Sequence, residues 1–202
     1  MPIQEDIESF ARGLGDRAEL AVQQALDLCS HGEWVIAFEC LLDNLHDSEV
    51  LVTDAEIDEA MAITRALGRS VMRVEALRGL ARDVDGRRRA VVFTVGHVTE
   101  PRALHDLLAL VCGFPSFYGR IWDAFWDAIT GLVQMPHVVM IWDRDLLATR
   151  LPRSALSLLE SLTSAREQYP ETAAELRLHA EGDAVIDVAA EFRRLEAIAK
   201  LS

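Results

Sequence analysis

Two short apolar segments in the second half of the chain constrain its fold more than any other feature. Residues 90–95 read AVVFTV, a β-branched run bounded by arginines and a glycine, which is typical of a strand. Residues 137–142 read HVVMIW, a continuous apolar run that indicates a buried strand. The residues between them carry helical spacing, so the strands are expected to run mainly parallel with helices packed against them.

Helical patterns and a third strand complete this half of the chain. Apolar residues recur at helical spacing after Pro101, over residues 120–134 and 152–169, and again over residues 185–200. Residues 174–180 alternate between polar and apolar side chains and predict a third strand. The element order therefore predicts an α/β domain with a three-stranded, mainly parallel sheet packed by helices and followed by a C-terminal helix.

The first half of the chain is expected to be all-helical. Apolar side chains at a spacing of three to four predict helices within residues 3–29, over residues 34–45 and over residues 54–67. Thr53 or Asp54 is the expected N-cap of the third of these, and residues 71–80 extend or follow it.

The segment DVDGRRR, residues 83–89, marks the expected domain boundary. It is polar, contains a glycine and carries charges of both signs. Residues 1–87 hold 18 acidic and 8 basic side chains, whereas residues 88–202 hold 15 and 12. We therefore expect a helical domain over residues 1–85 and an α/β domain over residues 86–202.

The net charge of −13 limits the classes of partner. An acidic chain repels nucleic acid and attracts a basic protein, so no direct nucleic-acid partner is expected. No segment approaches the ~18 apolar residues of a membrane-spanning helix, and the acidic N-terminus differs from a signal peptide. Three cysteines without a CxxC pair indicate reduced thiols. These features predict a cytoplasmic protein without a membrane partner, and they leave its oligomeric state open.

The segment FPSFYGRIWDAFWD, residues 114–127, carries the candidate functional site. Pro115 disfavours helical geometry at the residue before it, and Gly119 allows a sharp bend. The sequence therefore predicts a loop that is followed by a helix over residues 120–134, which Met135 and Pro136 terminate.

Two acids and two tryptophans share faces of this expected helix. Asp123 and Asp127 are four residues apart, and so are Trp122 and Trp126. Like charges at this spacing repel each other by a few tenths of a kcal/mol, so the face favours a cationic partner. We expect one tryptophan ring to be buried and the other to be exposed at its edge, with Trp126 the better contact residue.

The sequence indicates a non-catalytic protein without a metal or cofactor. It contains no HExxH, GxSxG, P-loop or GxGxxG motif. A hydrolase that uses Asp123 and Asp127 is the weakest hypothesis, because no base, metal ligand or oxyanion donor accompanies them. Asp143 and Asp145 follow the central strand and are expected to cap a loop rather than to bind a ligand.

The order of elements and the stretch FPSFYGRIWDAFWDAITG, residues 114–131, resemble the barstar family of small intracellular ribonuclease inhibitors. The resemblance covers residues 88–181. It implies that Asp127 enters a nuclease active site in place of a substrate phosphate and that Asp123 adds a second acidic contact. The other positions that it assigns to the toxin-binding surface are Phe117, Tyr118, Gly119, Trp126 and Thr130.

Several positions depart from the pattern of this family. Phe117 stands in place of a tyrosine, Ile121 in place of an asparagine and Leu132 in place of a tryptophan. The family's acidic residue in the following helix has no single match, because Glu160 and Glu167 flank its place. The departures imply either an inhibitor whose target differs from barnase or a domain that no longer inhibits a ribonuclease.

Residues 31–68 are similar, through shorter motifs, to the small helical immunity proteins of Maf-type toxins. These motifs are Gly32-Glu33-Trp34, Asp43-Asn44-Leu45 and Ala66-Leu67-Gly68. The similarity implies two immunity modules in tandem, with the acidic helices over residues 39–59 as a second binding face.

The sequence thus predicts an immunity protein or antitoxin. It would bind and block the active site of a cationic ribonuclease toxin through the helix 120–134 and the loop before it. The alternative is a non-inhibitory interaction or regulatory module that reuses the fold and contacts its partner through the helical domain.

Overall fold

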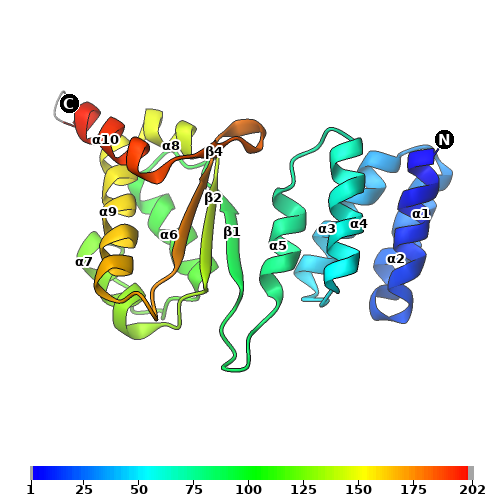
Figure 1. Cartoon of the computed structure of the whole chain (residues 1–202), viewed down its shortest axis with the longest axis horizontal. Helices are drawn as coiled ribbons and strands as arrows, with labels where there is room; N and C mark the ends of the chain where they lie inside the picture. The colour runs from blue at the N-terminus through cyan, green and yellow to red at the C-terminus, as the bar shows by residue number, and fades with distance from the viewer. Residues whose placement is uncertain (1, 200–202) are drawn as a thin grey trace. The chain divides into compact units, whose positions relative to one another are not determined.

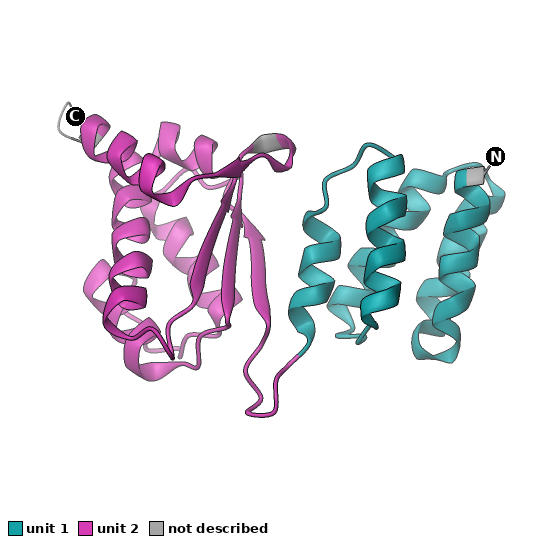
Figure 2. Ribbon diagram, viewed as in Figure 1, with its two compact units in different colours: residues 1–81 teal, residues 82–202 magenta. Residues whose placement is uncertain are grey.

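The computed structural model describes residues 2–199, with the side chains of all of them except residues 2, 181 and 199. The chain forms two compact units, residues 1–81 and residues 82–202 (Figure 2). The boundary predicted after residue 85 lies in the turn that opens the second unit. The last residue of the predicted helix 185–200 lies outside the described residues.

The first unit is helical, as predicted. Thr53 is the N-cap of its fourth α-helix: its hydroxyl accepts a hydrogen bond from the N–H of Glu56, whose carboxylate accepts one from the N–H of Thr53. Side chains from all five α-helices form one apolar core that includes Phe38 and Leu41. The elements are α1 (Pro2–Leu14), the 3-10 turn η1 (Gly15–Ala18), α2 (Glu19–Ser30), α3 (Trp34–Asp47), α4 (Asp54–Ala66) and α5 (Met72–Leu80) (Figure 1).

The second unit is a mixed α/β fold in which α6, α7 and α9 lie on one side of the sheet (Figure 1). Its strands are β1 (Ala90–Thr94), β2 (Val138–Trp142), β3 (Glu175–His179) and β4 (Val185–Ile186). Its helices and helical turns are α6 (Pro101–Cys112), α7 (Trp122–Asp127), the π turn η2 (Ala128–Leu132), α8 (Arg144–Arg150), α9 (Pro152–Gln168), η3 (Glu181–Asp183) and α10 (Val188–Ala199).

The register of the strands places one apolar face of the sheet against the helices. β1 and β2 run parallel with Val91 opposite Val139 and Phe93 opposite Ile141. β3 continues the parallel order and brings Leu178 opposite Ile141. These five side chains share one core with buried leucines of α6 and α9. The parallel part of the sheet is therefore as predicted.

The sheet has four strands in the order β1-β2-β3-β4, so the prediction of three strands was wrong. β4 runs antiparallel to β3, with Val185 opposite His179. The predicted helix 185–200 begins later for this reason. Its start is fixed by Asp187, whose carboxylate accepts a hydrogen bond from the N–H of Ala190 at 2.6 Å and so caps α10.

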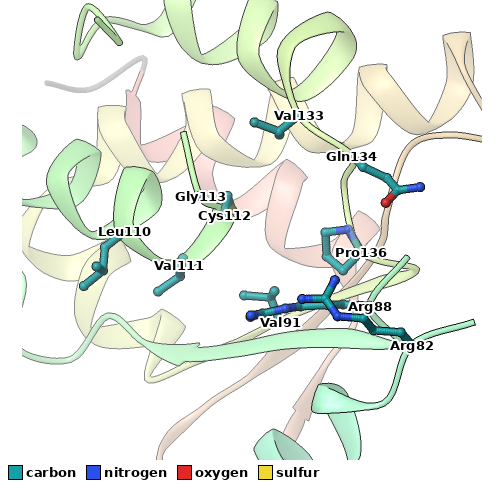
Figure 3. A pocket seen from close by; sticks show the side chains of 10 residues that line it. All are labelled: Arg82, Arg88, Val91, Leu110, Val111, Cys112, Gly113, Val133, Gln134 and Pro136. Carbon is teal, nitrogen blue, oxygen red and sulfur yellow. The ribbon is translucent and has the colours of Figure 1, made fainter. Parts of the chain in front are cut away.

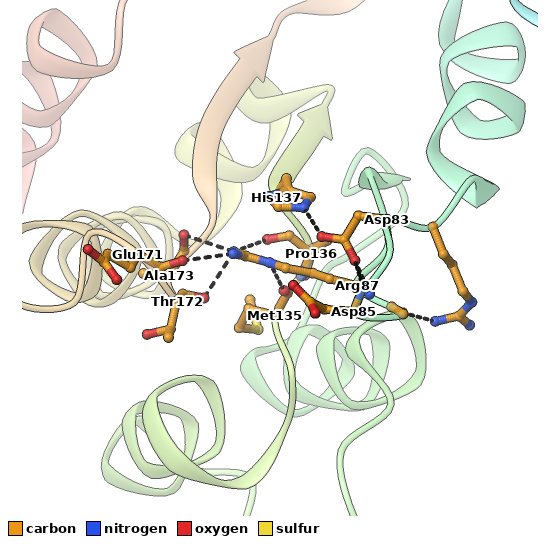
Figure 4. Close-up of polar contacts among 11 residues, drawn as sticks. Asp83, Asp85, Arg87, Met135, Pro136, His137, Glu171, Thr172 and Ala173 are labelled. Atoms are coloured by element: carbon orange, nitrogen blue, oxygen red, sulfur yellow. Dashed lines mark hydrogen bonds and ion pairs between the residues drawn. The ribbon is translucent and has the colours of Figure 1, made fainter.

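Arg87 fastens the starts of β2 and β3 from the turn that precedes β1 (Figure 4). Its guanidinium donates to backbone carbonyls on both segments, which a planar group with several fixed N–H donors is suited to do. The acceptors are Met135 at 2.7 Å, Glu171 at 2.8 Å, Pro136 at 2.9 Å, Thr172 at 3.0 Å and Ala173 at 3.1 Å.

Asp83 closes the same turn. Its carboxylate accepts hydrogen bonds from the N–H groups of Asp85 and Arg87 at 2.9 Å each. The other carboxylate oxygen lies 2.7 Å from Nε2 of His137 (Figure 4). This contact with His137 holds the pKa of Asp83 below its usual range.

A buried ion pair docks the last helix. Arg144 at the start of α8 is fully buried, and its Nη1 lies 3.6 Å from Oε1 of Glu191 on α10. The Nη2 group of Arg144 donates to the carbonyl of Ala155 at 3.2 Å, and Arg194 contacts the same glutamate at 3.1 Å. Burial lowers the pKa of Arg144 to about 10.

The helix α8 was not predicted, and Asp143 explains its start. Asp143 has a left-handed φ of 56°, and its carbonyl accepts a hydrogen bond from the N–H of Leu146 at 3.1 Å. Its carboxylate accepts a hydrogen bond from the hydroxyl of Thr94. Asp143 thus starts α8 rather than capping a loop, and its carboxylate is bound to Thr94.

Candidate functional site

The helix predicted over residues 120–134 is shorter in the structure and changes type. α7 continues into the π turn η2, where the N–H of Val133 donates to the carbonyl of Ala128 at 3.1 Å. Val133 itself is extended and ends the helical segment ahead of Pro136. Single π turns are uncommon and recur at functional sites, so this segment stands out from the other helices.

The sharp bend expected at Gly119 falls on Arg120, whose φ is 54°. A residue other than glycine rarely adopts this left-handed geometry. The guanidinium of Arg120 is paired through Nε with the carboxylate of Asp106 on α6. A Cβ atom at Gly119 would lie 3.4 Å from that of Ala124, which is an ordinary contact. The backbone therefore does not require glycine at position 119.

The two acids of the predicted site are exposed on α7, one turn apart. Asp123 lies in the first turn, where the helix dipole favours a carboxylate. Among the residues that the structure describes, the carboxylates of Asp123 and Asp127 have no hydrogen-bond or ion-pair partner. The face that they share is therefore acidic and not neutralised within the described chain.

Both tryptophan rings of α7 are half-buried, whereas one buried ring and one edge-exposed ring were expected. Trp122 lies against the imidazole of His105, with ring centroids 4.6 Å apart, and meets Phe125 edge-on at 5.7 Å. Trp126 packs at the border of the same core. Each ring thus keeps part of its surface exposed.

The loop before α7 alternates between exposed and buried side chains. Phe117 is 76% exposed and Gly119 is exposed, whereas Tyr118 between them is only 5% exposed. The hydroxyl of Tyr118 is hydrogen-bonded to Nδ1 of His105, and its ring lies 4.9 Å from that of Phe114. Burial raises the pKa of Tyr118 to about 12. Phe117 and Gly119 are therefore accessible, but the side chain of Tyr118 is not.

The far end of the helical segment adds a polar and an apolar group. Thr130 is half-buried, and its hydroxyl donates to the carbonyl of Trp126 at 2.7 Å. Leu132, the last residue of η2, is 52% exposed, and Ile121 is 57% exposed ahead of α7. Apolar side chains therefore stand at both ends of the acidic helix.

The two glutamates that flank the expected third acidic position lie on α9. Glu160 and Glu167 are both exposed. α7 packs against α9, so both glutamates belong to a helix that contacts α7.

Sequence reasoning missed His105 and Asp106, which contact the loop from α6. No local motif marks them, because only the fold brings α6 next to the loop. The available signal was the position of His105 beside Leu104 on the inward face of an amphipathic helix, where a buried polar ring needs a partner.

Three cavities of the second unit are lined by residues other than the two acids. A cavity of about 330 Å³ is lined by Arg82 and Arg88 and by none of the predicted site residues (Figure 3). Hollows of about 390 and 470 Å³ are bordered by Tyr118 and by Thr130, respectively. Asp123 and Asp127 line none of these three spaces. The two acids are exposed on α7, outside these three spaces.

Within residues 2–199, no group of three or more histidines, cysteines, aspartates or glutamates could hold a metal ion. No helix in this described range is long and apolar enough to cross a membrane.

Comparison with known proteins agrees with the geometry of the second unit. The model of the family described as Barstar (barnase inhibitor) matches residues 88–181. The chain is also similar to the putative ribonuclease inhibitor YrdF of Bacillus subtilis (strain 168), with 37% identity over 65 residues. That alignment covers 32% of this chain and 71% of the relative. The match does not reach residues 1–87, so their similarity to Maf-type immunity proteins stays a prediction. The second unit carries the family's match, and the chain belongs to the barstar family.

Proposed function

We propose that the chain is an immunity protein or antitoxin that binds a cognate ribonuclease toxin and blocks its active site. It acts by occupying a site that another protein uses for chemistry, so it needs no catalytic residue, metal or cofactor of its own. The family matched by residues 88–181 is described as barnase inhibitors, which supports a ribonuclease as the partner.

The single observation that carries this proposal is the exposure of Asp123 and Asp127 without a partner in the described chain. Two carboxylates one turn apart repel each other, so the free protein gains nothing from the arrangement. A cationic partner removes that repulsion. A ribonuclease active site is such a partner, because it holds phosphodiester charge with arginine, lysine and histidine. A carboxylate on a helix satisfies this charge and cannot be cleaved.

Each predicted contact has a role in this scheme. Asp127 stands in for the substrate phosphate, and Asp123 pairs with a second cation. The contacts around them come from Phe117, Gly119, Trp126 and Thr130, while Tyr118 supports the loop from within. Close charge pairs across the barnase–barstar interface, a complex of this family, couple by about 1.5–7 kcal/mol. Asp127 alone can therefore account for much of the affinity.

The apolar side chains around the acids indicate the kind of target. Phe117, Ile121 and Leu132 are more than half exposed, and they stand before and after the acidic helix. An exposed apolar side chain on a binding surface favours an apolar group on the partner, because association removes both from water. The cognate nuclease is therefore expected to present an apolar rim around its cationic pocket, and to differ from barnase in that rim.

The test is inhibition of purified ribonucleases by the full chain. The probes are barnase and any ribonuclease encoded beside the gene of this protein. The expected result is inhibition of the neighbouring ribonuclease, weakened by several kcal/mol in Asp127→Ala, as for close charge pairs. Glu100→Gln is the matched control, since it removes one exposed negative charge of the same unit at the residue before α6.

Two outcomes would contradict the proposal. The first is a chain that inhibits neither probe, and the second is inhibition that Asp127→Ala leaves intact. A pull-down that returns a non-nuclease protein through residues 1–85 would favour the interaction module instead.

A further inference from the structure

We propose that His105 and Asp106 on α6 are the positioning residues of the binding surface. They hold the loop 114–121 and the start of α7 in the shape that the nuclease recognises. This inference rests on the function proposed above. It adds two residues that act by holding other residues in place and need not contact the nuclease themselves.

Two contacts with α6, which we call tethers, hold the loop. The first, the ion pair between Arg120 and Asp106, fixes the bend of the loop. Arg120 holds a left-handed φ of 54°, a conformation that costs a non-glycine residue free energy. The loop keeps this geometry while the Nε of Arg120 is paired with the carboxylate of Asp106. The same contact holds the pKa of Asp106 below its usual range. Because Ile121 is extended directly after the bend, the direction in which α7 leaves the loop depends on Arg120.

The second tether fixes the side chains that face outward. Tyr118 is buried in the core. Its hydroxyl is hydrogen-bonded to Nδ1 of His105, and its N–H donates to the carbonyl of Pro115 at 2.9 Å. In such a short loop the burial of one residue turns its neighbours toward solvent. Phe117 and Gly119 are exposed on either side of it. A broken contact between Tyr118 and His105 would free both accessible residues at once.

His105 also touches the acidic helix. Its ring is 3% exposed and lies 4.6 Å from the ring of Trp122, the first residue of α7 and the neighbour of Asp123. One buried imidazole thus contacts both parts of the proposed surface. A protein that holds its binding loop in the bound shape before association avoids the entropy of ordering it, which raises affinity.

The chemistry of His105 makes this tether sensitive to acid. The neutral ring can accept the hydrogen of the Tyr118 hydroxyl at Nδ1, and an imidazolium cannot. Burial lowers the pKa of His105, while Asp106 raises it and Arg120 lowers it. Trp122, the group that faces the ring from α7, is uncharged at any pH of interest. Protonation therefore removes this acceptor, so the contact can continue only with the Nδ1–H group as the donor to the phenol oxygen, and it places a charge in the core.

The first experiment needs no partner and uses amide hydrogen exchange on the full chain. Wild type, Tyr118→Phe and His105→Leu are compared near pH 7.5 and pH 5.5 as protection factors, which correct for the intrinsic pH dependence of exchange. The N–H of Tyr118 should lose about fivefold to tenfold protection in either variant, equivalent to ~1–1.4 kcal/mol. The double variant should lose no more than one single variant, because both remove one hydrogen bond.

The second experiment measures binding to the neighbouring ribonuclease and to barnase. Tyr118→Phe should weaken binding about tenfold at pH 7.5. Wild-type affinity should fall toward pH 5.5 by more than that of Tyr118→Phe, and the shared nuclease cancels its own titration from the comparison. Asp106→Asn should weaken binding as well, whereas Glu100→Gln should not. Tyr118→Phe keeps the ring, so the test stands even if His105→Leu fails to fold.

Unchanged protection in Tyr118→Phe overturns this inference, whatever the nucleases show. The inference is also overturned if Asp127→Ala loses binding to a nuclease while Tyr118→Phe binds that nuclease as tightly as wild type does. In that case the proposed function stands. If neither nuclease binds wild type, the proposed function fails, and the exchange data alone decide whether His105 holds the loop.

Discussion

Asp127 follows Asp123 by one turn of α7, and both carboxylates are exposed without a partner among the described residues. Asp127→Asn should therefore leave the free energy of unfolding unchanged or raise it by a few tenths of a kcal/mol, because one like-charge repulsion disappears. The same variant should lose inhibition. Urea unfolding followed by tryptophan fluorescence and a nuclease assay measure the two effects. A loss of stability above about 1 kcal/mol would mean that Asp127 has a structural role.

Gly119→Ala tests whether glycine at position 119 matters for folding or for binding. The φ of Gly119 is not left-handed, and the added methyl group has an ordinary contact with Ala124 at 3.4 Å. Alanine restricts the unfolded chain, so stability should stay level or rise by about 0.4–1 kcal/mol. Inhibition should weaken, because the methyl group stands where the nuclease approaches the loop. Full inhibition at unchanged stability would remove Gly119 from the binding surface.

Local patterns predicted the parts of this fold that local forces decide. The apolar runs around Val91 and Val139 predicted the two parallel strands, since such segments bury both faces in a covered sheet. The spacing of Asp123 and Asp127 predicted that both acids share one face of a helix. The Thr53 cap could be predicted in the same way.

The missed features depend on contacts between distant segments. β4 has two residues and exists because Val185 pairs with His179, while Asp187 delays α10. The bend lies at Arg120 because its guanidinium forms an ion pair with Asp106 on another helix. Neither relation leaves a periodic signal in the sequence, so propensity alone assigned residues 185–187 to a helix and the bend to a glycine.

The buried His105 predicts how stability depends on pH. Burial lowers its pKa in the folded protein, so the unfolded chain binds the proton at a higher pH than the folded chain does. Its contribution to stability is complete above ~6.5, the pKa of an unfolded-chain histidine, and is lost as the pH falls below that value. Urea unfolding at about pH 7 and about pH 5 should show this loss in wild type, and a flatter profile in His105→Gln.

Two controls isolate His105 in that measurement. His97→Gln removes an exposed histidine and should keep the wild-type profile. Asp83 and Asp106 have lowered pKa values, so their contributions are lost only below about pH 4, outside the window. A wild-type profile in His105→Gln would show that this ring does not titrate with folding.

The side chain of Arg87 stabilises the sheet through hydrogen bonds to backbone carbonyls. Its effect on stability therefore depends on the shape of the guanidinium as well as on its charge. Arg87→Ala leaves the carbonyls before β2 and β3 without their donor, at an expected cost of about 2–4 kcal/mol. Arg87→Lys should recover only part of this, because an ammonium cannot reach both segments as a planar fork does. Urea unfolding measures both variants. Equal stability of wild type and Arg87→Lys would show that charge alone suffices.

The pair formed by Arg144 and Glu191 predicts a contrast between single and double substitutions. Glu191→Ala leaves the charge of Arg144 buried without its counterion, so stability should fall by about 3–5 kcal/mol. Replacing both, as Arg144→Met with Glu191→Leu, should recover most of that loss, since apolar groups of similar size need no counterion. Arg193→Ala, exposed on the same helix, is the control and should change stability by less than about 0.5 kcal/mol. If the double variant is less stable than Glu191→Ala, the two charges themselves hold α10 in place.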